Sequence, residues 1–99
     1  MDDVILTFYC AAGDADALAT TLRGATGLPI HVREETVHGH DFGDAHIREQ
    51  VMGTLHRAAV VLEVSREKGN SLISAVTTMR RAQPVRWVMT PILARGRIA

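Results

Sequence analysis

The histidines of this chain gather in one stretch. Four of the five lie between positions 38 and 57, together with three glycines and two aspartates. His38 and His40 flank one glycine, and in an extended segment they project to the same side. With His46 and the aspartates they could form a nitrogen and oxygen shell suited to zinc, copper or nickel. The spacing matches no specific metal motif, so solvated loop histidines are the alternative to a site at His38, His40 and His46.

The same stretch could instead hold an anion. Its glycines would let backbone amides approach a phosphate, and a helix beginning near Asp44 would add further donors. Arginines from the same or a neighbouring subunit could pair with the ligand. The Gly-Lys-Ser/Thr ending of a Walker motif is absent. The residues alone favour neither interpretation. The candidate anion-binding residues are Gly39, His40, Gly43, Arg57, Arg95 and Arg97.

Composition argues against several classes of protein. Eleven basic and eleven acidic residues give a formal net charge of zero, which is a poor basis for binding nucleic acid. The single cysteine, Cys10, cannot form an intramolecular disulfide. We find no secretion signal and no apolar run of about 20 residues, so we expect a soluble cytoplasmic protein. No nucleophile–base pair stands out, and we therefore do not expect an enzyme.

The apolar patterns predict one domain over residues 1–99, with six elements in the order βαββαβ. This order is typical of the α+β ferredoxin-like sandwich, an antiparallel four-stranded sheet with two helices on one face. The connection between strands two and three, from 38 to 57, is longer than a hairpin needs, and long connections are usually functional or disordered. The strands are predicted at 3–10, 30–37, 58–64 and 85–93, and the second helix at 67–82.

Local signals suggest where the helices begin and end. Asp14 or Asp16 is expected to cap the first helix, because a carboxylate there accepts from free backbone amides. Gly24 and Gly27 are expected to end that helix, and Pro84 is expected to end the second.

The predicted sheet has too many apolar residues for one core. Residues 3–10 are apolar on both faces, and Val61, Trp87 or Val88 must also be covered. Because both helices lie on one face, the other face would expose these side chains. We therefore expect a homo-oligomer that covers the helix-free face.

Three segments carry a resemblance to a known family. They are Val-His-Gly-His at 37–40, Glu-Gln-Val-Met-Gly at 49–53, and Trp-Val-Met-Thr-Pro-Ile-Leu-Ala-Arg-Gly-Arg at 87–97. Together with the βαββαβ order they resemble the PII-like superfamily, and most of all a small proteobacterial branch found beside heavy-metal efflux genes. The long connection then corresponds to the T-loop, although it lacks the tyrosine that is uridylylated in nitrogen-regulatory members.

The resemblance implies a homotrimer that binds a small effector, namely ADP, AMP, ATP or bicarbonate, in clefts between subunits. Such proteins regulate membrane transporters or enzymes through the T-loop. Gly39 and Gly43 fall near the glycine-rich entry to that loop, and Arg95 and Arg97 near the basic residues that meet phosphate. The related CutA proteins are linked to divalent metals. The alternative function is therefore a sensor or chaperone for zinc or copper.

Overall fold

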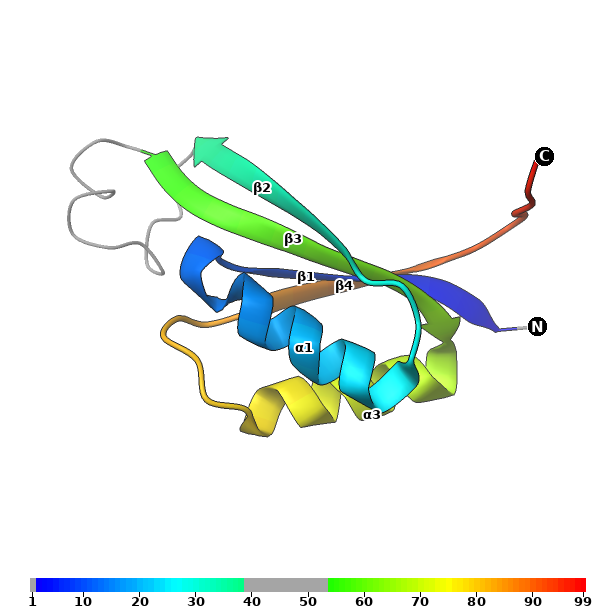
Figure 1. Ribbon diagram of the computed structural model, residues 1–99, viewed down its shortest axis with the longest axis horizontal. Coiled ribbons are helices and arrows are strands. Elements are labelled where there is room, and N and C mark those ends of the chain that lie inside the picture. Colours follow the sequence, from blue (N-terminus) through cyan, green and yellow to red (C-terminus); the bar gives the residue numbers. More distant parts are fainter. Residues whose placement is uncertain (1, 39–53) are drawn as a thin grey trace.

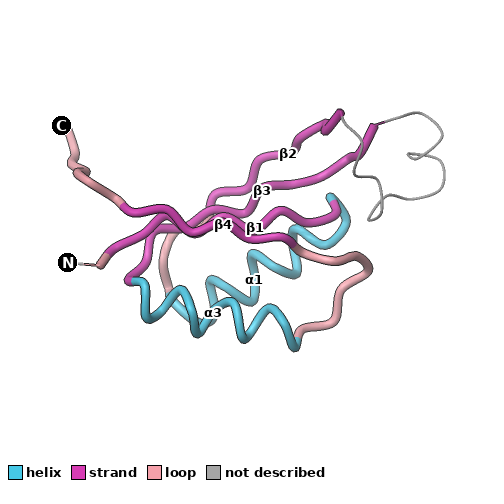
Figure 2. Tube along the Cα trace, turned by 180° about the vertical axis from the view of Figure 1, so that it is seen from behind, coloured by secondary structure: helices cyan, strands magenta, loops and turns pink. Residues whose placement is uncertain are grey.

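Four strands form one antiparallel sheet in the order β2-β3-β1-β4 (Figure 1). The computed structural model describes residues 2–38 and 54–99. Both helices cover the same face of the sheet, as Figure 2 shows from behind. The predicted α+β ferredoxin-like class is thereby confirmed. The elements are β1 (Asp3–Ala11), η1 (Ala12–Asp14), α1 (Ala15–Thr26), β2 (His31–His38), β3 (Thr54–Ser65), α3 (Arg66–Thr78) and β4 (Arg86–Pro91).

The core lies between the sheet and the two helices. Alternate residues of β1 point into it, because successive side chains of a strand face opposite sides. Four residues of β3 stand directly opposite them in register, and leucines and a valine of the helices close the layer. The central core residues are Val4, Leu6, Phe8, Cys10, Ala58, Val60, Leu62, Val64, Leu18, Leu22, Leu72 and Val76.

The first helix is bounded by Asp14 and Gly27, as predicted, but Asp14 does not cap it and Gly24 does not end it. Asp14 occupies the N-cap position but makes no side-chain cap bond. Its buried carboxylate instead accepts from the backbone N–H groups of Ala82, at 3.0 and 3.1 Å, and of Gln83, at 3.2 Å. Gly27 ends the helix in the left-handed region, with φ at 68°, a conformation that glycine adopts without strain. The predicted stop at Gly24 is wrong, since it lies within α1.

The second helix ends at Thr78, before the predicted Ala82. The backbone becomes extended at Met79, with ψ at 151°, and Ala82 and Gln83 donate their amides to Asp14 rather than to helical carbonyls. Arg81 also folds back and donates to the carbonyl oxygens of Thr77, at 3.3 Å, and Met79, at 3.1 Å. The chain after α3 is therefore fixed by two side chains, and Pro84 plays no part in ending the helix.

The strands differ from their predicted ranges mainly at their ends. β3 begins at Thr54 rather than Ala58, because its pairing with β2 continues to His38, past the last pair of β1 with β3. β4 ends at Pro91, which suits the end of an edge strand, since proline cannot donate to the ladder.

The helix-free face of the sheet carries apolar residues, as predicted. Ile5 of β1 and Val88 of β4 are 37% and 42% exposed on it, and Val61 of β3, on the other side of β1 from Val88, is half-buried. Trp87 is different, since it pairs with Phe8 and so lies on the helix-covered side, at the sheet edge. Expecting Trp87 to need the same cover as Val61 and Val88 was therefore wrong.

Candidate functional site

Most of the predicted metal and loop residues lie outside the described residues: Gly39, His40, Gly43 and His46. His38 is the last residue of β2 and is exposed, paired in register with Thr54. Across residues 2–38 and 54–99, no three His, Cys, Asp or Glu side chains gather in a way that could hold a metal ion. The same part of the chain has no helix with the length and apolar character needed to cross a membrane.

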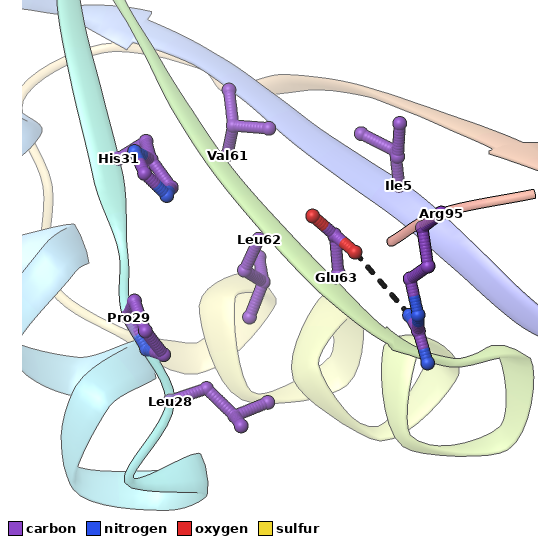
Figure 3. A pocket seen from close by; sticks show the side chains of 8 residues that line it. All are labelled: Ile5, Leu28, Pro29, His31, Val61, Leu62, Glu63 and Arg95. Carbon is purple, nitrogen blue, oxygen red and sulfur yellow. Dashed lines mark hydrogen bonds and ion pairs between the residues drawn. The ribbon is translucent and has the colours of Figure 1, made fainter. Parts of the chain in front are cut away.

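A pocket of about 380 Å³ lies where the connection from α1 to β2 meets the sheet and the segment after β4 (Figure 3). Its size is within the range of small-molecule sites, and it combines an apolar wall with a few polar groups, as such sites do. The polar groups are His31, Glu63 and Arg95. The apolar wall consists of Ile5, Leu28, Pro29, Val61 and Leu62.

Arg95 is one of the predicted anion-binding residues, and the structure places it at this pocket. Its side chain is 51% exposed and forms ion pairs with two carboxylates. One guanidinium nitrogen pairs with Asp3 of β1, and the other lies 3.3 Å from Oε1 of Glu63 on β3, the contact dashed in Figure 3. The hydrogen bond that Arg95 donates to the Asp3 carboxylate raises the pKa of Arg95. Two carboxylates thus already compensate this guanidinium.

Arg57, another predicted anion-binding residue, has a different environment. It is buried, and its guanidinium donates to the carbonyl oxygens of Tyr9, at 3.1 Å, and Pro84, at 3.4 Å. These bonds join β3 to β1 and to the chain that enters β4. Arg57 therefore links β3 to β1 and to the segment before β4.

The predicted arginines do not converge within one chain. Arg57 pairs with Ala11, at the end of β1, whereas Arg95 contacts Asp3, at its beginning. These two ends of β1 are about 26 Å apart, since a strand rises about 3.3 Å per residue. Arg97 is exposed, two residues beyond Arg95. A site that used Arg57 and Arg95 together would need residues from two subunits.

Sequence reasoning did not single out His31, Asp3 and Glu63. Glu63 did leave a signal, because it is the one charged residue within the apolar run 58–64. A charge in such a run indicates a special contact, and here that contact is the ion pair with Arg95. Asp3 and His31 left no comparable signal, since their role depends on the strand register.

Comparisons with other proteins place the chain in a family. Residues 1–99 match the family model described as "Protein of unknown function (DUF3240)". The crystal structure of a DUF3240 family protein from Shewanella baltica OS155 is similar, with a TM-score of 0.77 and 13% sequence identity, over 100% of this chain and 99% of that chain. At this identity the likeness concerns the fold alone. No curated protein matches the chain.

Proposed function

We propose that this chain, which belongs to the DUF3240 family, is a cytoplasmic, non-catalytic regulatory protein of the PII-like type. It assembles as a homotrimer and binds a small anionic ligand, with an adenine nucleotide as the first candidate, in clefts between subunits. Through the connection between β2 and β3 it regulates a membrane transporter.

The observation that carries this proposal is the helix-free face of the sheet. Ile5, Val61 and Val88 lie around Thr7 on three adjacent strands, and they form an apolar band that neither helix covers. Uncovered apolar bands of this kind mark association surfaces, and most soluble oligomers are closed and symmetric. A second copy packed on this band turns the neighbouring pocket into a cleft between subunits, where groups from both chains reach the ligand.

The chemistry of the pocket supports a ligand with a flat apolar part and an anionic part. Leu28 and Pro29, which line the pocket outside the apolar band, provide an aliphatic surface for a ring. Arg95, at the polar end, offers a planar guanidinium that can pair with a phosphate through two parallel hydrogen bonds. His31 supplies a further polar contact. An adenine nucleotide has this combination of parts.

The proposal is tested by measuring mass and binding on the purified protein. Light scattering should give three times the chain mass of 10.8 kDa. Calorimetric titration with ADP, AMP, ATP and bicarbonate should give an isotherm that Arg95→Ala abolishes. Arg80→Ala is the matched control, because Arg80 is an exposed arginine next to α3 that is not part of the pocket. Its isotherm should match that of the wild type.

Two results would overturn the proposal. A monomeric mass would show that the protein has no cleft between subunits. A titration without heat of binding for every anion would show that the pocket does not bind these ligands. A zinc or copper isotherm that His38→Ala/His40→Ala abolishes, without any nucleotide binding, would establish the metal sensor or chaperone in its place.

A further inference from the structure

We propose that Asp3 and Glu63 are internal competitors for Arg95, so that an anion binding Arg95 releases the segment 92–99 from the sheet. We call this segment the arm. The inference rests on the proposed anion binding at the pocket, and it adds two features to it. First, Asp3 and Glu63 determine which anions can bind Arg95. Second, binding of the anion leads to movement of the arm.

The arm is tied to the sheet near its beginning. The backbone N–H of Ile92 donates to the carbonyl oxygen of Asp3 at 3.1 Å, and Arg95 follows with its two ion pairs. Leu93 and Ile98 are fully exposed, and Figure 1 shows the arm leaving the sheet beyond β4. The Arg95 side chain therefore holds the arm to β1 and β3.

Asp3 and Glu63 oppose the binding of an anion as long as Arg95 is paired with them. Asp3 and Glu63 carry two negative charges, and Arg95 carries one positive charge. An anion that approaches the pocket is repelled unless the guanidinium turns from the carboxylates toward the ligand. The Arg95–Glu63 pair is solvent-exposed and the Arg95–Asp3 pair is partly so, and pairs of this kind contribute little stability. A phosphate group that binds the guanidinium through two oxygens can therefore displace them.

This competition favours doubly charged ligands. A monovalent anion such as bicarbonate brings one charge to replace two carboxylates, whereas a terminal phosphate brings nearly two. The site should therefore prefer phosphate-bearing ligands to bicarbonate. Once Arg95 has turned, the arm is still held by the hydrogen bond from the Ile92 N–H to the Asp3 carbonyl oxygen. This bond lies at the end of the pairing between β1 and β4, where water competes for the same groups.

Binding is tested by calorimetry with ADP and with pyrophosphate. Glu63→Gln and Asp3→Asn each remove one competing charge and keep the size of the side chain. Each should lower the Kd by about 2- to 5-fold, as expected for the loss of one exposed ion pair. Asp16→Asn, which removes an exposed carboxylate from the first turn of α1, should leave the Kd unchanged.

Release of the arm is tested by hydrogen exchange on the same proteins. The amide of Ile92, whose N–H bonds to the carbonyl oxygen of Asp3, should exchange faster in wild type saturated with pyrophosphate. Its exchange should be equally fast in ligand-free Arg95→Gln. An unchanged or higher Kd in Glu63→Gln and Asp3→Asn overturns the competition and leaves the proposed function standing, as does slower exchange of the arm on binding. An absence of binding of ADP and pyrophosphate to the wild type and all variants overturns both.

Discussion

Arg57 and Arg95 were predicted for the same role, but the two ends of β1 give them opposite surroundings. Arg57 is buried and donates to backbone carbonyl oxygens, which are neutral and fixed. Arg95 is half-exposed and pairs with two carboxylates, which are charged and carried on rotatable side chains. Leaving a buried donor or acceptor without its partner is costly, whereas an exposed ion pair exchanges readily with water or ligand. The difference indicates a structural arginine at one end and an exchangeable one at the other.

The largest expected change in stability is for a substitution of Arg57. Arg57→Leu removes the buried guanidinium and leaves the Tyr9 and Pro84 carbonyl oxygens, which are partly buried, without this donor. The free energy of unfolding in urea should fall by about 2–4 kcal/mol. Arg86→Ala is the control, because it loses only a stacking contact with the Tyr9 ring, 4.7 Å from the guanidinium carbon to the ring centre. Its loss should be about 1 kcal/mol or less. Equal losses in the two variants would contradict a structural role for Arg57.

A smaller effect should come from Cys10, which lies at the Arg57 end. Burial raises the pKa of the Cys10 thiol, while the charge of Arg57 lowers it and that of Asp14 raises it. Since the folded pKa lies above the ordinary value of 9.0, the unfolded chain loses its proton first as the pH rises. The free energy of unfolding should therefore fall above pH 9, by at most about 1.4 kcal/mol per pH unit.

Cys10→Ala provides the comparison that isolates this contribution. It removes the thiol, so its unfolding free energy should decline less steeply above pH 9 than that of wild type. Parallel curves for the two proteins would show that the thiol has the same pKa in the folded and unfolded states. Measurements should use urea denaturation at several pH values with a reductant present.

The smallest effect on stability is expected for Arg95→Ala. The ion pairs that it removes are exposed, so the melting temperature should fall by less than about 3 °C. Calorimetry on Arg95→Ala and Arg57→Leu side by side checks this directly. A melting temperature for Arg95→Ala as low as that of Arg57→Leu would mean that both arginines are structural, and the comparison between the two ends would fail.

The fold could be predicted further than the site because the two depend on different information. Alternating residues such as Leu6 and Phe8 indicate a strand wherever its partners lie, and leucines at helical spacing indicate α1 directly. Asp14 shows the limit of local reasoning. Its position favoured a helix cap, but its carboxylate binds amides 68 and 69 residues away. The same holds for Arg57, whose partners depend on which strands become neighbours.

The site residues show that limit more clearly. Arg95 could be selected as an arginine able to pair with an anion and from the family resemblance. Asp3 and Glu63 come into contact with it only through the pairing of β1 with β3 and β4. No spacing in the sequence relates position 3 to position 95. The choice between metal and anion rested on residues 38–57, most of which the structure does not describe, so it stays a prediction.

The central position of β1 has a consequence for how the chain folds during synthesis. β1 leaves the ribosome before the other strands, yet both of its neighbours, β3 and β4, follow it only after α1 and β2. Non-local pairings of this kind slow folding, because a long loop must close before any contact forms. The apolar residues on both faces of β1 therefore remain uncovered until β3 and β4 have been synthesised. During that interval β1 is the segment that chaperones should recognise and that is most prone to aggregate.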